Sequence, residues 1–201
     1  MNGHVVPLAA PTDKDGFLGY KSMIIVKTGN PFQSLGDVKA KRLGLSDPKS
    51  TSGNQAPRFF LKEDGIDIDS YFKSATFSGS HENSVMGLMN GAFDCVAVPW
   101  YSENETIVTR MERKGLVPAG SCRIIWQSPM LPASPFAVPA WLPDELREEI
   151  RTALLEMPKR NQELFKSLYD GRAKSIEPVS RKDYDPVVRM IRENLETRTN
   201  S

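Results

Sequence analysis

The feature that most constrains the fold is a regular alternation of short apolar runs with helical patterns from Tyr20 onward. Runs of β-branched residues predict strands at 22–26, 42–45, 73–77, 94–98 and 123–127. Between them, we expect helices at 35–40, 52–63, 82–90 and 102–114. Strands that alternate with helices build a mainly parallel sheet flanked by helices, so the sequence predicts an α/β fold.

The chain has a different character on either side of this region. Residues 128–135 contain three prolines, which exclude an interior helix and predict an extended crossover. After it, we expect a strand near 136–138 and helices at 144–157, 162–169 and 183–196. The segment 5–19 has two prolines and no clear period, which is typical of a connector or the remnant of a strand.

Composition excludes several classes of function. The formal net charge is +1, so no global field gathers nucleic acid or an anionic membrane, and any anion is bound locally. Two cysteines, Cys95 and Cys122, are too few for a disulfide scaffold or a structural zinc site, although they could form one bridge. We expect no metal and no cofactor. The first residues show no signal-peptide pattern, and no apolar run approaches the length of a spanning helix.

The most informative segment is a hydroxyl-rich loop between a predicted strand and a predicted helix. Ser50, Thr51 and Ser52 stand together at the start of that helix, beside free backbone N–H groups and the positive end of the helix dipole. This arrangement suits a tetrahedral oxyanion. The alternative is ordinary helix capping by Ser50 or Ser52. The loop does not have the spacing of a nucleotide-binding P-loop.

A second strand-to-helix loop places His81 at the same predicted edge of the sheet, where ligands collect in open α/β folds. The alternative is a structural or capping histidine. His81 and Glu82 together also suggest acid/base chemistry on a phosphoryl compound, and we rank this enzyme hypothesis last because His4 is the only other histidine.

A third loop carries aromatic side chains after the strand 94–98. Trp100 and Tyr101 form either a wall for a small ligand, with Tyr101 as a phenolic donor, or a packed pair. In the second case Ser102 caps the next helix with Glu105 as its capping-box partner. The apolar surroundings of Cys95 predict an unreactive thiol.

Five segments together resemble a known family, the phosphonate, phosphite and phosphate substrate-binding proteins of ABC transporters. They occur in the family's order and with nearly its spacing. They are Gly19–Val26, Asp47–Gly53, Gly79–Asn83, Asp94–Ala97 and Trp126–Pro129. The resemblance implies a fold like that of the type II periplasmic binding proteins, in which two lobes close on a ligand. It implies no catalysis.

The resemblance also implies roles for particular residues. Ser50, Thr51 and Ser52 correspond to the cradle for the oxygens of the ligand, and His81 to a histidine that donates to the same group. Tyr20 resembles a tyrosine that reaches into the cleft. Trp100 and Tyr101 stand where binders of aminoalkylphosphonates place an acid, and Glu103 is the nearest alternative acid. We therefore expect a smaller oxyanion such as phosphite, methylphosphonate or phosphate.

Compared with the family, the second lobe is complete and the first is partial. We expect residues 1–19 to be a connector or a remnant of the first lobe, 20–127 to form the second lobe, and 128–201 to be a crossover and helices of the first lobe. The implied partners are a small phosphorus oxyanion and the transmembrane subunits of an ABC permease, in the periplasm, without nucleic acid. The alternative is a ligand-sensing module of a regulatory system with the same fold.

Overall fold

The computed structural model describes residues 4–16 and 18–199, with side chains described to 196. The chain divides into two compact units. Unit 1 comprises residues 1–20 and 132–188, and unit 2 comprises residues 21–131 and 189–201. The chain therefore passes from one unit to the other at 20/21 and at 131/132, close to the predicted boundaries at 19/20 and 127/128. Residues 189–201, which we expected to belong with the first lobe, are part of unit 2. Residues 1–3 and 17 of the predicted connector lie outside the described residues.

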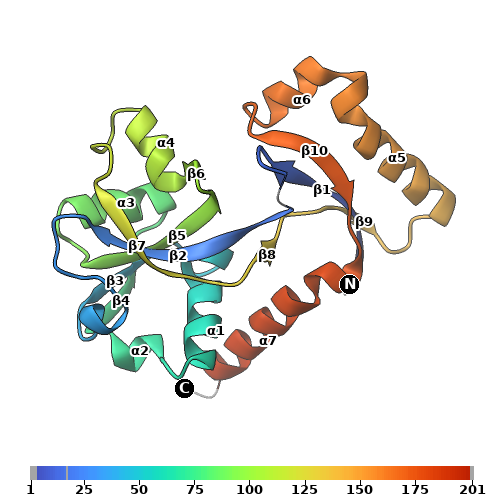
Figure 1. The fold of residues 1–201 in the computed structure, drawn as a ribbon. Helices are drawn as coiled ribbons and strands as arrows, with labels where there is room; N and C mark the ends of the chain where they lie inside the picture. Colours follow the sequence, from blue (N-terminus) through green and yellow to red (C-terminus); the bar gives the residue numbers. More distant parts are fainter. Residues whose placement is uncertain (1–3, 17, 200–201) are drawn as a thin grey trace. The chain divides into compact units, whose positions relative to one another are not determined.

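Unit 2 is built on a mixed sheet in the order β4-β3-β5-β2-β7 (Figure 1). Its strands are β2 (Gly19–Lys27), β3 (Arg42–Leu45), β4 (Ser74–Phe77), β5 (Cys95–Ser102) and β7 (Cys122–Gln127). Two short strands, β6 (Glu105–Thr106) and β8 (Leu131–Pro132), pair with β5 and β2. Strand β2 is antiparallel to both neighbours, whereas β3 is parallel to β4 and β5, so β4, β3, β5 and β7 share one direction.

Helices cover both faces of this sheet. On one side lie η1 (Gly36–Val38), α1 (Ala56–Glu63) and α2 (Ile68–Tyr71), and on the other α3 (His81–Met89) and α4 (Ile107–Arg113). Alternate residues of β2 enter the two cores: Met23 and Ile25 pack with α3 and α4, and Ile24 and Val26 with the opposite layer. All four are at most 1% exposed. Because the part of β2 from residue 23 to residue 26 is buried on both faces, its sequence there is an unbroken apolar run.

The predicted helix at 102–114 is wrong at its start. Ser102 is the last residue of β5, and α4 begins after Thr106. Thr106 is the N-cap: its hydroxyl accepts from the Thr109 N–H at 3.1 Å, and Thr109 Oγ1 accepts from the Thr106 N–H at 2.9 Å. The predicted capping box of Ser102 and Glu105 is therefore not formed, because a threonine pair performs that task four residues later.

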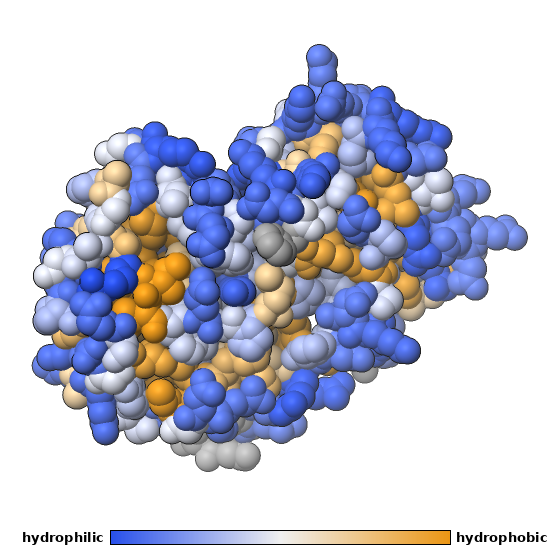
Figure 2. Space-filling model, viewed as in Figure 1, coloured by the Kyte–Doolittle hydropathy of each residue, from blue (hydrophilic) through white to orange (hydrophobic). Residues whose placement is uncertain are grey.

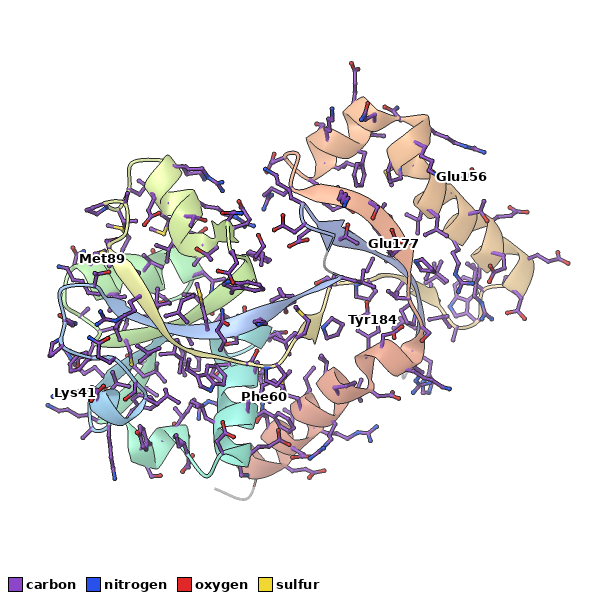
Figure 3. The ribbon with its side chains drawn as sticks, viewed as in Figure 1. Lys41, Phe60, Met89, Glu156, Glu177 and Tyr184 are labelled. Carbon is purple, nitrogen blue, oxygen red and sulfur yellow. The ribbon has the colours of Figure 1, made fainter. Side chains whose placement is uncertain are left out.

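Unit 1 contains a smaller sheet, in the order β10-β1-β9, that is antiparallel throughout. It is formed by β1 (Val5–Asp13), β9 (Phe136–Pro139) and β10 (Ala173–Pro178) and accompanied by α5 (Asp144–Arg160), α6 (Gln162–Leu168) and η3 (Arg181–Tyr184). One cluster of buried residues in this unit comprises Ala9, Phe165 and Ile176, and Leu8 and Ala10 are also fully buried. Tyr184, labelled in Figure 3, donates its hydroxyl to the Ala133 carbonyl at 2.8 Å.

Helix α5 contributes less to the core than its length suggests. None of its described residues is buried, and Leu146 is 41% exposed. Figure 2 shows apolar surface among the polar side chains over this helix. The helix packs against the rest of unit 1 through partly buried apolar side chains, among them Leu154, Leu155 and Met157.

The last helix, α7 (Asp185–Thr199), starts in unit 1 and ends in unit 2. In unit 2 it is bound to α1 and the turn that precedes it. Asn194 Nδ2 donates to the carbonyl of Gln55 at 2.9 Å, and the Arg189 guanidinium lies 5.5 Å from the ring of Phe59. These contacts explain why residues 189–201 belong with unit 2. Within the described part of the chain, no helix combines the length and apolar character that crossing a bilayer requires.

Candidate functional site

The predicted oxyanion loop forms a tight helical turn between β3 and α1 in unit 2. Ser50 is the N-cap of η2 (Thr51–Gln55), a π-type turn that continues directly into α1. Ser50 Oγ accepts from the Gly53 N–H, and the Gln55 N–H donates to the Ser50 carbonyl, both at 3.0 Å. The interpretation of Ser50 as a helix cap is therefore correct. Its hydroxyl oxygen accepts in this bond, and its hydrogen is still available to donate. The N–H groups of Thr51 and Ser52 precede the first intrahelical bond.

Side chains within the turn hold its shape. Asn54 is fully buried and donates to the Pro48 carbonyl at 2.8 Å, and the same carbonyl accepts from Gln55 Nε2 at 2.7 Å. Arg58, one turn into α1, donates to Asn54 Oδ1 at 2.9 Å. The turn is therefore preorganised by bonds that do not use the hydroxyls of Ser50 and Thr51 as donors.

The same turn is bound to the sheet through serines. Ser22 Oγ, in β2, donates to the Ser52 carbonyl at 2.6 Å. The Ser22 N–H in turn donates to Ser128 Oγ at 2.9 Å. Ser52 is only 4% exposed, whereas Ser50 and Thr51 are partly exposed. Sequence reasoning did not find the roles of Ser22 and Ser128, because isolated serines carry no pattern.

The loop before α3 brings His81 next to this turn. The Gly79 N–H donates to the Ser46 carbonyl at 2.8 Å, which joins the two loops, and Gly79 has φ of +91°, a conformation that favours glycine. Ser80 caps α3 by accepting from the Asn83 N–H at 3.0 Å. A Cβ placed on Gly53 would lie 2.9 Å from His81 Cε1. The structure therefore brings His81 and the Ser50–Ser52 turn together, as the sequence predicts.

His81 is electrically neutral at neutral pH. Burial lowers the pKa of its imidazole below the usual 6.5, and the nearby carboxylate of Glu82 opposes this only in part. A neutral imidazole presents one donor and one acceptor. The imidazole of His81 can therefore donate one hydrogen bond and accept another beside the turn.

Ser46 is a member of this cluster that sequence reasoning missed. It follows β3 directly and is 1% exposed. Its Oγ and His81 Nδ1 are buried side-chain atoms without a hydrogen-bond partner among the described residues. A Cβ on Gly53 would lie 1.8 Å from Ser46 Oγ. Only glycine fits at position 53, and a lone serine after a strand gives no signal that would distinguish it.

The aromatic pair Trp100 and Tyr101 lies within β5 and not in a loop after it, because the strand continues to Ser102, and the pair is divided between core and surface. Trp100 is 5% exposed and packs in the core with α3 and α4, with Lys21 Nζ 4.8 Å from its ring centroid. Tyr101 is partly exposed, and the guanidinium of Arg110 lies 4.4 Å from its ring. Tyr20 is half-buried near the start of β2 and is the last residue of unit 1. Ligand contacts of Tyr20 and Tyr101 stay predictions.

Other reactive groups of the described residues lie outside the cluster. Cys95 and Cys122 are free thiols, and burial raises the pKa of both, that of Cys122 to about 11. The described residues contain no group of three or more side chains that could hold a metal ion. Unit 1 contains a cavity of about 320 Å³, lined by residues that include His4, Arg181 and Tyr184. None of its lining residues is a predicted ligand residue.

Comparisons with known proteins agree on one family. A family model described as the periplasmic substrate-binding protein of phosphonate ABC transporters matches residues 1–184. The chain is 28% identical to the phosphate-import protein PhnD of Mycolicibacterium smegmatis over 93% of this chain. It is 26% identical to the phosphonates-binding periplasmic protein of Escherichia coli over 81% of this chain.

Solved structures show the same fold. A binding protein component of an ABC phosphonate transporter from Pseudomonas aeruginosa matches 98% of this chain with a TM-score of 0.74 and 25% identity. The fold is therefore that of the type II periplasmic binding proteins, as expected. The chain spans 62% of the M. smegmatis relative, 47% of the E. coli relative and 64% of the P. aeruginosa structure.

Proposed function

Because this chain belongs to the periplasmic substrate-binding proteins of phosphonate ABC transporters, a family of binding proteins and not of enzymes, we propose that it captures a small phosphorus oxyanion. The ligand binds at the Ser50–Ser52 turn beside His81. The observation that carries this proposal is the meeting of three features in unit 2. They are a preorganised helical turn, hydroxyls with hydrogens left to donate, and a neutral imidazole.

The chemistry of these groups suits an oxyanion. Hydroxyls and N–H groups at a helix start donate to anionic oxygens, and the helix dipole favours negative charge there. Neutral donors bind an anion without placing a counter-charge in the site. A hydrogen bond to a charged group contributes about 1.5–3 kcal/mol, so a few such donors suffice for micromolar binding.

The test is calorimetric titration of the chain with phosphite, methylphosphonate, phosphate and aminoethylphosphonate. We expect Ser50→Ala, Thr51→Ala and His81→Ala each to weaken binding by about tenfold to a hundredfold, the factor that one charge-assisted hydrogen bond supplies. Thr28→Ala is the matched hydroxyl control, because Thr28 lies beyond the far end of β2 and donates to the Gly120 carbonyl. His4→Ala is the histidine control. Wild-type affinity in all three site variants would contradict the assignment of the site.

We propose that the ligand is a small oxyanion without an ammonium group. The support is electrostatic: Tyr101, where the resemblance places an acid in aminoalkylphosphonate binders, has the Arg110 guanidinium 4.4 Å from its ring. The neighbouring carboxylate of Glu105 is bound by Arg110 and Arg113. A cationic surrounding disfavours an ammonium group. Tighter binding of aminoethylphosphonate than of methylphosphonate would contradict this preference.

Delivery of the ligand to a permease in the periplasm is the remaining part of the proposal. Family membership supports it, since the relatives are named as transport components. Stimulation of a reconstituted cognate transporter by the ligand-loaded chain would test it, and His81→Ala is the control for ligand dependence. Equal stimulation by the unloaded chain would contradict delivery.

A further inference from the structure

Two buried polar atoms in the candidate site lack partners and lie against the same backbone position. Ser46 Oγ and His81 Nδ1 are enclosed, and neither has a hydrogen-bond partner among the described residues. Ser46 Oγ and His81 Cε1, the ring atom between Nδ1 and Nε2, both lie within 3 Å of the point where a Cβ on Gly53 would stand. A buried polar group without a partner is costly, so such a pair in one place requires an explanation.

The hydrogen inventory of the two groups permits one fully satisfied arrangement. A serine hydroxyl has one hydrogen to donate, and a neutral imidazole has one N–H and one acceptor nitrogen. If Nδ1 carries the hydrogen and donates to Ser46, the hydroxyl hydrogen of Ser46 still lacks an acceptor. If Nδ1 is the acceptor, the hydroxyl hydrogen is satisfied and the imidazole hydrogen sits on Nε2. The second arrangement leaves no buried hydrogen unpaired.

We propose that Ser46 is a positioning residue that fixes the tautomer of His81. The Ser46 hydroxyl donates to His81 Nδ1, directly after a rotation about its single side-chain torsion or through one bridging water. Nε2, which is not enclosed in the way that Nδ1 is, then carries the hydrogen. This inference rests on the proposed function in one respect: the N–H on Nε2 is the donor offered to the oxyanion.

The tautomer has a consequence for the ligand. With Nε2 as donor, the imidazole offers an N–H and binds an oxyanion oxygen that carries no hydrogen. With the other tautomer, Nε2 would accept and would prefer a protonated oxygen. Ser46 therefore determines which kind of ligand oxygen faces the imidazole, without touching the ligand.

The experiment uses the 201-residue chain with ¹⁵N-labelled histidine, at a pH where imidazole is neutral. Two-bond proton–nitrogen correlation spectra distinguish the protonated ring nitrogen from the bare one. The chain has two histidines, so His4→Gln identifies the signals of His81. We expect the Nε2–H tautomer in the wild type and a clear rise of the Nδ1–H tautomer in Ser46→Ala.

The matched control is Ser84→Ala. Ser84 is also fully buried and lies in α3, like His81, but its Oγ is bound to Ser78 Oγ at 2.7 Å and to the Ser80 carbonyl at 3.1 Å. It should leave the His81 tautomer unchanged. If Ser46 had only a structural role, Ser46→Ala would not change the tautomer of His81 that the spectra report. A dominant Nδ1–H tautomer in the wild type, or an unchanged tautomer in Ser46→Ala, would overturn the proposal.

Titration with methylphosphonate separates this inference from the proposed function. We expect Ser46→Ala to weaken binding by about fivefold, the factor that corresponds to one neutral hydrogen bond. Unchanged affinity despite a changed tautomer would overturn the positioning role. If the wild type bound none of the oxyanions, the proposed function would fail, while the spectra would still decide whether Ser46 fixes the tautomer.

Discussion

Position 53 shows how closely the backbone of the candidate site is packed. A Cβ there would lie 1.8 Å from Ser46 Oγ and 2.9 Å from His81 Cε1. We expect Gly53→Ala to lower the free energy of unfolding by about 1–3 kcal/mol, because over-packing forces backbone and side chains to shift. It should also abolish oxyanion binding. Urea unfolding followed by circular dichroism measures the first effect, and calorimetry measures the second.

Gly29→Ala is the control for this substitution, since no atom lies within 4 Å of a Cβ at that position. The double variant with Ser46→Ala should recover only part of the loss, because Ser46 Cβ would still lie 2.7 Å from the new methyl group. Equal stability of Gly53→Ala and Gly29→Ala would contradict this account.

The buried imidazole of His81 makes stability depend on pH. Its pKa in the folded chain is lowered by burial, so below pH 6.5 the unfolded chain binds a proton that the folded chain resists. The stabilising contribution is fully present above pH 6.5 and is lost as pH falls through the folded pKa. We expect the free energy of unfolding to decrease as pH falls below 6.5, and His81→Gln to flatten this part of the profile. If His81→Gln and the wild type had the same dependence of unfolding free energy on pH, this contribution of His81 would be excluded.

At the scale of single residues, the sequence predicted the part of the candidate site that has a pattern. Three adjacent hydroxyls at a helix start and a histidine at the next strand-to-helix loop are recognisable, and the structure brings Ser50 and His81 into one cluster. Ser46 and Ser22 could not be found in this way. Their roles depend on contacts between segments that are distant in the sequence, such as Ser22 Oγ with the Ser52 carbonyl.

At the scale of elements, the segment between β5 and α4 depends on one carboxylate. Glu105 is 6% exposed and accepts from Arg110 Nε and Arg113 Nη2, each at 2.5 Å. Burial opposes its charge, but the bonds from Arg113 and Arg110 outweigh burial and lower its pKa. We expect Glu105→Gln to reduce the free energy of unfolding by about 1.5–3 kcal/mol, as for a hydrogen bond to a charged group.

The contribution of Glu105 is present above the unfolded-state pKa of 4.5 and is lost as pH falls through the lower folded value. Thermal unfolding at several pH values measures it. Glu103→Gln is the control, because Glu103 is exposed in the same turn and should change stability little. Similar losses in both variants would argue against the pairing.

The elements that the sequence predicted well are those with strong periodic patterns, and β3 has the predicted bounds, Arg42–Leu45. Strand β1 was not recognised as a full strand because it contains Pro7 and Pro11, which are unusual in a central strand. The structure accommodates them with register shifts between Pro7 and Ala9 and between Pro11 and Asp13. Strand β10 was missed because its sequence, AKSIEP, has a single β-branched residue, Ile176, and no run of apolar residues.

At the scale of the whole molecule, the two units differ in how much apolar surface they bury. Unit 2 contains two extensive cores on opposite faces of its sheet, whereas α5 of unit 1 has no buried residue among those described. Regions with few buried contacts open more readily. We expect amide hydrogen exchange to be faster in β1, β9 and β10 than in β2 and β5.

Two core truncations separate the units in that experiment. Phe165→Ala should accelerate exchange mainly in unit 1, and Leu61→Ala mainly in unit 2, since each removes a buried side chain from one core. Uniform exchange across both sheets would show that the chain opens as one cooperative body.

Ser22 connects the candidate site to the path of the chain itself. The chain passes between the units after Tyr20, after Leu131 and after Val188, and Ser22 and Ser128 stand within a few residues of the first two connections. They are joined by two hydrogen bonds of 2.9 Å, from the Ser22 N–H to the side-chain oxygen Ser128 Oγ and from the Ser128 N–H to the Ser22 carbonyl. Ser22 Oγ then reaches the Ser52 carbonyl at 2.6 Å. The segments that follow Tyr20 and precede Pro132 are therefore fastened to each other and to the Ser50–Ser52 turn by one continuous series of hydrogen bonds.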